Sequence, residues 1–370
     1  MKVPQFQPWV GAEEYSAMGS CFEKNWITEG PQTRLFQRQL LDLTGSGYGV
    51  FAPNGTLALY LGLKAIGVGV GDEVIVPDFT FIGSATAIEM VGAKPVFCDV
   101  HPGHYQIDLA AAAKLITPET KAIMPVHMYG TVCDMAAVSD FAQCHSLLVI
   151  EDAAQAIGAH FKGRHAGTFG TVGIFSFFAD KTITTAEGGF VITDDPEIHD
   201  KLLHLRNQGR QDRGTFIHPE IGYNFRMTDL QSAMGIVQLG KLPEIIRRKQ
   251  HILARYRYHL QGLRPVRFFE PPEGAEWIPF RIPVLCERAH DLMAFLTSSE
   301  IESRSFFYPL HRQPAFRYLL EDSSYCHSMG DDHFPQAISA YDNGVCLPIF
   351  PELSDEQIEY VCARVREFYA

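Results

Sequence analysis

The stretch that decides the fold runs from Val149 to Phe190. It begins V-I-E-D-A-A-Q-A (149–156) and ends F-S-F-F-A-D-K-T-I-T-T-A-E-G-G-F (175–190). The run Leu147–Ile150 is apolar enough for a strand that is buried on both faces. We therefore expect the carboxylate of Asp152 to emerge at the carboxyl edge of a parallel sheet, where α/β proteins bind ligands. A lone lysine, Lys181, follows a second apolar run, Ile174–Phe178.

Asp152 and Lys181 suit a cofactor with a pyridine ring and an aldehyde. A carboxylate at this edge can pair with the pyridine nitrogen and keep it protonated, so that the ring withdraws electrons from the substrate carbon. An apolar setting would lower the pKa of Lys181 and favour an imine, and the displaced amine could then move protons. Taken alone, Asp152 better fits a helix N-cap ahead of Ala153–Ile157. In this context the alternative for Lys181, a solvated surface lysine, is disfavoured.

Short apolar runs alternate with helix-like segments between Tyr48 and Thr193. The predicted strands are Tyr48–Ala52, Glu73–Pro77, Pro95–Val100, Lys121–His127, Leu147–Ala153, Ile174–Phe178 and Phe190–Thr193. The predicted helices are Thr56–Ile66, Phe81–Val91 and Met135–His145. This alternation predicts an α/β fold with a mainly parallel sheet between helices, and the last two strands are expected to form a hairpin on that sheet.

The pattern changes in the second half of the chain. Beyond Pro196 it becomes helical, and a long segment from Thr228 to about Leu260 would link a large domain to a smaller one. After it, the predicted elements are a strand, Phe280–Leu285, and two helices, His290–Leu296 and Ser354–Phe368. We therefore expect a large cofactor-binding domain over residues 1–248 and a small C-terminal α+β domain over residues 249–370.

A phosphate site is predicted ahead of the helix in A-P-N-G-T-L-A-L-Y (52–60). Gly55 and Thr56 would lie at its N-terminus, where free N–H groups and the helix dipole attract phosphate. Ser176 could add a hydroxyl from the strand that leads to Lys181. On its own, the segment Asn54–Thr56 fits an ordinary N-cap turn better.

Two further side chains are candidates for contacts with a flat cofactor. Phe81 follows P-D-F-T (77–80) at the same sheet edge, so its ring could lie against a heteroaromatic ring; packing in the core is the alternative. Gln155 could donate a hydrogen bond to a ring substituent such as a phenolic oxygen, or it could be a surface amide.

Together these motifs resemble the DegT/DnrJ/EryC1/StrS family of sugar aminotransferases over nearly the whole chain. Besides the Asp152 and Lys181 motifs, the supporting segments are N-G-T-L-A-L-Y-L-G-L (54–63), G-D-E-V-I-V-P-D-F-T-F-I-G-S-A-T-A-I (71–88), K-A-I-M-P-V-H-M-Y-G (121–130) and I-G-Y-N-F-R-M-T-D-L-Q-S-A-M-G (221–235). The resemblance implies the aspartate-aminotransferase type of fold (fold type I). It also implies pyridoxal 5′-phosphate as cofactor, pyridoxamine 5′-phosphate as intermediate, L-glutamate as amino donor, and a homodimer with shared active sites.

The resemblance also assigns roles to residues. Lys181 matches the Schiff-base lysine and Asp152 the partner of the pyridine nitrogen. Gly55, Thr56 and Ser176 match phosphate-binding positions. Phe81 matches the aromatic residue that stacks on the cofactor ring, and Gln155 matches a position near the phenolic oxygen. Asn224 and Arg226 match a segment that reaches the neighbouring subunit's cofactor or substrate.

Within the family, four segments look most like perosamine-synthase-like enzymes, which aminate C4 of a GDP-linked 4-keto-6-deoxy sugar. These segments are I-T-T-A-E-G-G (183–189), R-N-Q-G-R (206–210), I-G-Y-N-F-R-M-T (221–228) and F-Y-P-L-H-R-Q-P-A-F (307–316). Related dehydratases carry histidine where this chain has Lys181. Gln155 and the pair Ala179-Asp180 depart from the usual Glu and Gly-Asn, which leaves the sugar open: a 3-aminotransferase, or a UDP- or dTDP-sugar 4-aminotransferase, is the alternative.

Substrate contacts are less well marked. Tyr308 and His311 could bind oxygens of the sugar or its diphosphate, although a structural histidine is equally compatible. Arg206, Arg210 and Arg213 could meet the substrate's phosphates, and solvated charges at a helix end would look the same.

Composition narrows the class of partner. The formal net charge of −12 disfavours nucleic acid and anionic membranes, and no apolar run could span a bilayer. The eight cysteines are scattered without the spacing of a zinc knuckle, so no metal site and a reducing cytoplasm are expected.

Two other functions suit parts of this pattern. A nicotinamide oxidoreductase would suit the alternating pattern, but neither glycine run, 45–49 or 67–71, completes G-x-G-x-x-G. A non-catalytic regulator that binds the same cofactor is disfavoured by the intact Lys181 and Asp152 and by the lack of a DNA-binding module.

Overall fold

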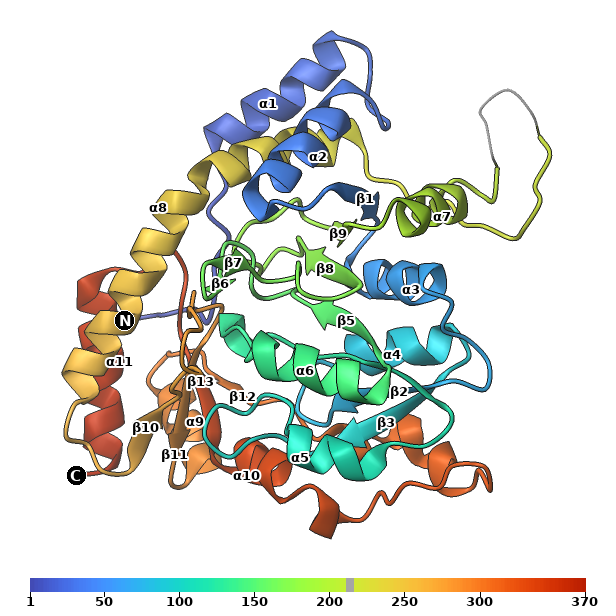
Figure 1. Cartoon of the computed structure of the whole chain (residues 1–370). Coiled ribbons are helices and arrows are strands. Elements are labelled where there is room, and N and C mark those ends of the chain that lie inside the picture. Colours follow the sequence, from blue (N-terminus) through green and yellow to red (C-terminus); the bar gives the residue numbers. More distant parts are fainter. Residues whose placement is uncertain (211–215) are drawn as a thin grey trace.

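The computed structural model describes residues 1–210 and 216–370, and Arg213 therefore lies outside the described residues. Its centre is a seven-stranded sheet (Figure 1). In spatial order the strands are β1 (Tyr48–Ala52), β9 (Gly189–Thr193), β8 (Val172–Ser176), β5 (Leu148–Asp152), β4 (Thr120–Ile123), β2 (Glu73–Pro77) and β3 (Lys94–Cys98). β9 is antiparallel to both β1 and β8, and the other neighbours are parallel. The predicted α/β fold and the predicted hairpin of the last two strands are confirmed.

The strand predictions differ from the structure mainly at their ends. β4 ends at Ile123 instead of His127, because Pro125 has no N–H to donate to a ladder. β8 lies two residues before the predicted run, since Phe177 and Phe178 leave the sheet to form the next loop. No helix follows Asp152, so the interpretation of this residue as a helix N-cap is wrong.

The helices cover both faces of the sheet and extend beyond it (Figure 1). They include α1 (Ala12–Glu23), α2 (Pro31–Thr44), α3 (Gly55–Ala65), α4 (Gly83–Met90), α6 (Met135–His145) and α7 (Pro196–Arg206). α3 packs against β8, β9 and α4, while α1 and α2 pack against the long helix α8 (Asp229–Leu260). α8 begins with a capping box between Thr228 and Gln231, which satisfies backbone N–H groups of its first turn.

A smaller antiparallel sheet follows α8. Its strands are β10 (Val266–Phe268), β11 (Ile282–Cys286), β13 (Gly344–Leu347) and β12 (Arg304–Ser305), in that order. Helices α9 (Ala289–Ser298), α10 (Pro335–Asn343) and α11 (Asp355–Phe368) pack around it, and α11 also contacts α8. The expected α+β character of this part is confirmed, whereas the boundary at residue 249 falls inside α8 and stays a prediction.

Short elements complete the fold. They are α5 (Leu109–Ala112), the two-stranded sheet β6 (His160–Phe161) and β7 (Arg164–His165), and the 3₁₀ turns η1 (Ala113–Leu115), η2 (Met128–Gly130), η3 (Leu310–Arg312), η4 (Pro314–Leu320) and η5 (Asp331–His333). In the described part of the chain, no helix is both long and apolar enough to cross a bilayer. β2 and β9 are buried at every position, as expected for strands that are covered on both faces.

Candidate active site

A cavity of about 590 Å³ opens at the carboxyl ends of β5 and β8. It is lined by Asn54, Gly55, Thr56, Leu57, Leu59, Phe81, Gly83, Ser84, Asp152, Ala154, Gln155, Ser176, Phe178, Asp180, Lys181, Glu187, Phe280, Arg281, Arg304 and Phe307. The structure therefore brings together seven of the predicted site residues: Gly55, Thr56, Phe81, Asp152, Gln155, Ser176 and Lys181.

Asp152 is the last residue of β5 and is only 6% exposed. Its Oδ2 accepts a hydrogen bond from the hydroxyl of Ser84 (2.7 Å), and its Oδ1 accepts one from the N–H of Ala154 (3.1 Å). Ser84 lies in the first turn of α4 and is itself 3.2 Å from the hydroxyl of Thr80. These contacts fix the carboxylate at the floor of the cavity. Sequence reasoning missed Ser84, although it stands in the same motif as Phe81.

Lys181 lies on the loop that joins β8 to β9. Backbone hydrogen bonds close this loop at its base, from the N–H of Phe177 to the carbonyl of Gly188 and from the N–H of Thr185 to the carbonyl of Phe177. Thr184 adds a hydroxyl that donates to the same Phe177 carbonyl. The loop is thus anchored to the hairpin, and it holds Lys181 at the cavity wall.

The surroundings of Lys181 favour a neutral amine. Burial lowers the pKa of Lys181, and the opposing attraction of Asp180 and Asp152 offsets only part of this effect. Its Nζ lies 4.7 Å from the centroid of the Phe280 ring. A neutral amine is the nucleophilic form, so this setting suits attack on an aldehyde. A solvated surface lysine is excluded.

The N-terminus of α3 faces Ser176 across a very short gap. A Cβ built on Gly55 would lie 2.8 Å from Cβ and 2.9 Å from Oγ of Ser176, so only glycine allows this approach. Asn54 caps the helix by accepting the N–H of Leu57 (3.0 Å), which confirms the ordinary cap. Within the described residues, the N–H groups of Gly55 and Thr56 have no hydrogen-bond partner. The helix is therefore capped and, in the described part of the chain, still presents two N–H groups without a protein partner at the cavity, as a phosphate site would require.

Phe81 and Gln155 both line the cavity. Phe81 is 55% exposed and precedes α4, which begins two residues later than predicted, so its ring is not part of the core. Gln155 is only 6% exposed, and its Oε1 accepts the N–H of Tyr129 (2.8 Å). This bond leaves the amide NH₂ of Gln155 to donate into the cavity, and the alternative of a surface amide is wrong.

Cationic side chains from the small sheet reach the cavity, and sequence reasoning missed them. Arg281 forms an ion pair with Asp180, and its Nη1 donates to Oε1 of Gln5 (3.3 Å). Arg304 of β12 is exposed and contributes a second guanidinium to the lining. No periodicity indicates which arginine of a distant segment folds back onto the sheet edge.

A second lysine, Lys249 of α8, is buried close to Lys181. Its Nζ donates to the hydroxyl of Thr182 (3.3 Å) and lies 5.9 Å from the Phe280 centroid. Burial, with a smaller contribution from Arg281, lowers the pKa of Lys249 to about 7. Lys249 does not line the large cavity. It lines a much smaller one of about 20 Å³, between α8 and the N-terminal segment.

The segment that follows α7 lies apart from the cavity of its own chain. Nη2 of Arg226 donates to Oδ1 of Asn207 (2.9 Å), and Asn224 forms a β-bridge with Asn207. In Figure 1 this segment projects from the body beside α7. The structure therefore does not bring Asn224 and Arg226 together with Lys181 within one chain.

Within the predicted arginine cluster, Arg206 is not available to a substrate. Arg206 is buried and donates to both carboxylate oxygens of Glu29 (3.1 and 2.9 Å). It also donates to the carbonyls of Phe51 and Phe225. The expectation that Arg206 binds substrate phosphates is not met, because its guanidinium is already paired with the carboxylate of Glu29.

Tyr308 and His311 also lie outside the cavity lining. Tyr308 packs edge-on against Tyr341. The ring nitrogens of His311 are taken by Asp78 (2.7 Å) and Asp331 (3.1 Å), and its side chain is 1% exposed. His311 is thus the structural histidine of the two interpretations given above.

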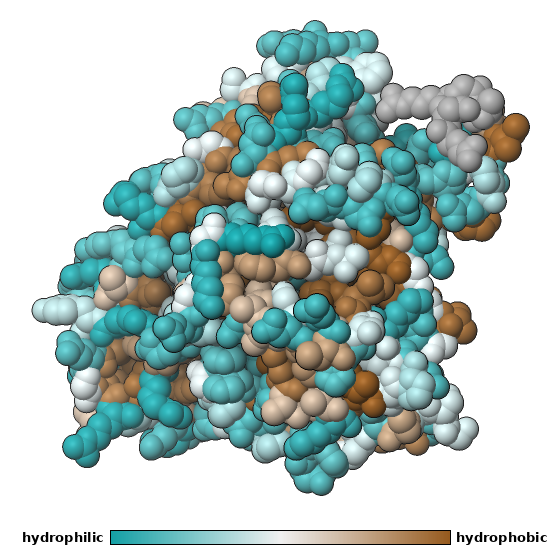
Figure 2. Space-filling model, in the orientation of Figure 1, coloured by the Kyte–Doolittle hydropathy of each residue, from teal (hydrophilic) through white to brown (hydrophobic). Residues whose placement is uncertain are grey.

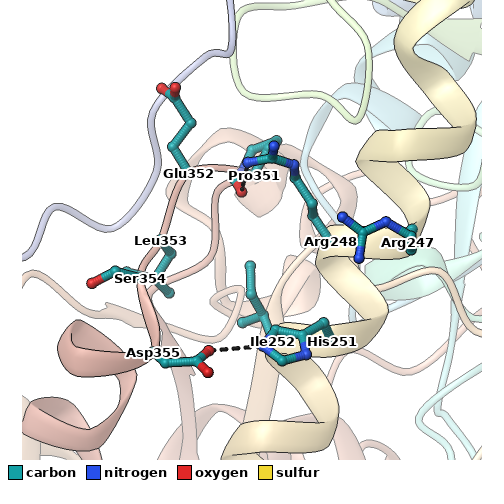
Figure 3. Close-up of a pocket in the computed structure, with 9 residues that line it drawn as sticks. All are labelled: Arg247, Arg248, His251, Ile252, Pro351, Glu352, Leu353, Ser354 and Asp355. Atoms are coloured by element: carbon teal, nitrogen blue, oxygen red, sulfur yellow. Dashed lines mark hydrogen bonds and ion pairs between the residues drawn. The ribbon is translucent and has the colours of Figure 1, made fainter.

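A second hollow, of about 340 Å³, separates α8 from the segment before α11 (Figure 3). It is lined by Arg247, Arg248, His251, Ile252, Pro351, Glu352, Leu353, Ser354 and Asp355. His251 contacts Asp355 (2.7 Å), and both arginines pair with Glu244. None of the predicted site residues lies here, so we assign the chemistry to the larger cavity.

Known proteins with similar sequences point to the same chemistry. The model of the DegT/DnrJ/EryC1/StrS aminotransferase family matches residues 8–366. A GDP-perosamine synthase of Escherichia coli O157:H7 is 36% identical over 370 residues, which is all of this chain and 99% of that protein. A UDP-N-acetyl-3-dehydro-alpha-D-glucosamine 3-aminotransferase of Acidithiobacillus ferrooxidans is 37% identical, over 96% of this chain and 93% of that protein.

Solved structures support the expected fold. A putative sugar aminotransferase of Streptococcus pneumoniae, Spr1654 in its PMP form, superposes with a TM-score of 0.90 at 27% identity and covers the whole of both chains. The expectation of an aminotransferase fold with a pyridoxal phosphate cofactor is thereby confirmed. The chain belongs to the DegT/DnrJ/EryC1/StrS family of sugar aminotransferases, which are pyridoxal-phosphate-dependent transaminases.

Proposed function

We propose that this enzyme moves an amino group from L-glutamate to C4 of a GDP-linked 4-keto-6-deoxy hexose, as GDP-perosamine synthases do. The observation that carries the proposal is the meeting of Lys181 and Asp152 on one cavity, in a chain 36% identical to such a synthase over its full length. A 3-aminotransferase acting on a UDP-linked ketosugar is the second candidate, because a relative with that name is 37% identical.

The cavity residues fit pyridoxal phosphate. The close approach of Gly55 to Ser176 leaves N–H groups and a hydroxyl for a phosphate, and Asp152 offers a buried anion for a protonated pyridine nitrogen. Phe81 offers an exposed ring for stacking, and Gln155 an amide NH₂ for the phenolic oxygen. Bound there, the cofactor would accept an amino group from the donor and pass it to the ketosugar.

Lys181 is the proposed proton carrier. Its lowered pKa keeps a larger fraction of the amine neutral near pH 7, so Nζ can accept a proton from a substrate carbon and return it to a neighbouring atom. Asp152 is held by Ser84 and Ala154 and does not move during this transfer. In this proposal Lys181 acts as the base, and Asp152 supplies a negative charge that is held in place.

Arg304 is proposed to bind the anionic groups of the substrates, whereas Arg281, which also lines the cavity, is already paired with Asp180. A protein with a net charge of −12 needs local cations to attract glutamate and a nucleotide diphosphate. Arg304 is exposed on the lining, and Arg281 is oriented by Asp180 and Gln5. Tyr308, 38% exposed, is a more remote candidate for a sugar contact.

A homodimer is proposed from the projecting segment that carries Asn224 and Arg226. Phe216, Ile217 and Ile221 on it are 87%, 71% and 82% exposed, which is unfavourable in water. Figure 2 shows apolar surface at the outer end of this segment. In a second copy such a segment could reach the neighbouring cavity. A cytoplasmic location, where nucleotide sugars and reduced thiols occur together, agrees with the eight unpaired cysteines.

A substrate panel tests the proposal. The purified holoenzyme would be incubated with L-glutamate and with GDP-, UDP- and dTDP-linked 3- and 4-ketosugars, and the aminated products identified by mass spectrometry. We expect the highest kcat/KM with a GDP-linked 4-ketosugar. Turnover of a UDP-linked 3-ketosugar alone would favour the second candidate, and no turnover with any ketosugar would favour a regulator.

A further inference from the structure

Three side chains of metal-binding type meet at the amino end of β2. Glu73 begins this strand, and Cys326 and His327 are consecutive residues between η4 and η5. One ligand atom of each lies within 4.8 Å of the other two. The cluster stands at the opposite end of β2 from Phe81 and the cavity, so amino transfer does not use it.

The distances approach those of a zinc site. Tetrahedral zinc binds nitrogen and oxygen at about 2.0–2.1 Å and thiolate sulfur at about 2.3 Å, which places neighbouring ligand atoms roughly 3.3–3.6 Å apart. Nε2 of His327 is 3.1 Å from both carboxylate oxygens of Glu73. The thiol of Cys326 is exposed and lies within 4.8 Å of the other two ligand atoms, so a rotation of its side chain can adjust its position.

The segment that carries Cys326 and His327 is held in place by contacts of its own. The hydroxyl of Tyr325 donates to the carbonyl of Pro95 (3.1 Å), and Lys94 forms an ion pair with Asp322 (2.6 Å). The ring of Tyr325 packs edge-on against His327 at 5.2 Å between centroids. These contacts position the ring of His327 before any ion binds.

The carboxylate of Glu73 is buried and oriented by a neighbouring hydroxyl. It is 4% exposed and accepts a hydrogen bond from the hydroxyl of Thr117 (2.6 Å). The neighbouring carboxylate of Asp72 is paired with Lys121 (2.9 Å). A divalent ion would thus meet a charged ligand in a partly enclosed place.

We propose that Glu73, Cys326 and His327 bind one zinc ion, which fastens the segment 321–330 to the edge of the central sheet. The thiol of Cys326 releases its proton to solvent on binding, and the imidazole proton of His327 resides on Nδ1 so that Nε2 coordinates. Carboxylate and thiolate together balance the two charges of the ion. A water molecule completes the tetrahedron.

Zinc titration of the untagged holoenzyme tests the proposal, with a chromophoric chelator as competitor. We expect one equivalent of tightly bound zinc, and at least a tenfold weaker affinity in Cys326→Ser and in His327→Gln. Cys144 is also exposed, on α6 and away from this cluster, so Cys144→Ser is the matched control and should bind zinc like the wild type.

Two further readouts separate a built site from incidental binding. In weakly buffered solution, zinc should release about one proton from the wild type and none from Cys326→Ser. Zinc should also raise the Tm of the wild type but not that of Cys326→Ser, while the absorbance of the bound cofactor stays the same in both. Equal zinc affinity of Cys326→Ser and the wild type, or no stoichiometric binding by the wild type, would overturn the proposal.

Discussion

Two lysines lie against the ring of Phe280, one at the cavity and one in the core beneath α8. Lys181 faces a space of about 590 Å³ that also contains Asp152, whereas Lys249 adjoins a space of only about 20 Å³ and donates to Thr182. Burial lowers the pKa of both amines. A depressed pKa therefore does not by itself distinguish Lys181 from Lys249; access to a cavity with a facing carboxylate does.

Replacing each lysine in turn should break this comparison most clearly. We expect Lys181→Ala to lose about 10²–10⁴-fold or more in kcat, because no other group replaces a positioned base. Lys249→Met keeps a similar volume and should retain activity within a few-fold. Steady-state kinetics with glutamate and a ketosugar measure both. Similar losses in the two variants would mean that the lysines act as a pair.

Removing the charge of Asp152 tests whether its carboxylate is what makes the surroundings of Lys181 differ from those of Lys249. Asp152→Asn can still accept the hydroxyl hydrogen bond of Ser84, so the protein should fold. We expect kcat/KM to fall on the order of 10²–10³-fold, as for the loss of one electrostatic stabiliser in other enzymes. Circular dichroism and Tm check the fold. An active variant would show that the carboxylate serves only to shape the cavity.

The buried amine of Lys249 should make the stability of the protein depend on pH. The pKa of Lys249 is about 7 in the folded chain, against about 10.4 for an unperturbed lysine. Between these values the unfolded state binds more protons, so the wild type gains stability as pH rises from 7 to 10, and below pH 7 the full cost of burial remains. Lys249→Met should therefore be more stable than the wild type by roughly 4 kcal/mol at pH 7.

Urea denaturation at pH 7 and at pH 9.5 measures this difference. The advantage of Lys249→Met should shrink toward zero at the higher pH. An unchanged advantage at both values would indicate that packing, and not the charge of the lysine, sets the difference.

The smallest effect concerns the support of Asp152. Ser84→Ala removes one hydrogen bond to a carboxylate, worth about 1.5 kcal/mol, so we expect roughly a tenfold loss of kcat/KM. Ser139→Ala is the control, since Ser139 bonds only within α6, to the carbonyl of Met135 (2.7 Å). Equal activities of the two variants would remove Ser84 from the account.

The cavity floor could be predicted from the sequence because its residues follow from local rules. Asp152 ends an apolar strand, and Gly55 begins a helix after another strand. Parallel strands bring such ends to one edge of the sheet. Arg281 and Arg304 were missed because they reach the site through the packing of the small sheet, and Lys249 because α8 places it beside the site. No local pattern encodes that packing.

His311 is the opposite case, because the sequence offered it as a substrate contact and the structure pairs its ring within the chain. Its motif placed a polar ring on a loop, where a substrate contact and a structural role are equally compatible. Asp78, 233 residues earlier, accepts the backbone N–H of His311 (2.7 Å) and also contacts the ring. Only the folded chain reveals such a partner. The cluster of Glu73 with Cys326 and His327 was missed for the same reason, since cysteine spacing says nothing of a ligand 253 residues away.

The central claim is that the cofactor is attached to Lys181. The most direct test is to identify the lysine that carries it. The holoenzyme would be reduced with borohydride and digested, and the peptide that carries the cofactor's mass would be sequenced by mass spectrometry. We expect the added mass on Lys181, within the peptide that contains F-A-D-K-T-I. Cofactor mass on Lys249, or retained in a Lys181→Ala variant, would contradict the account.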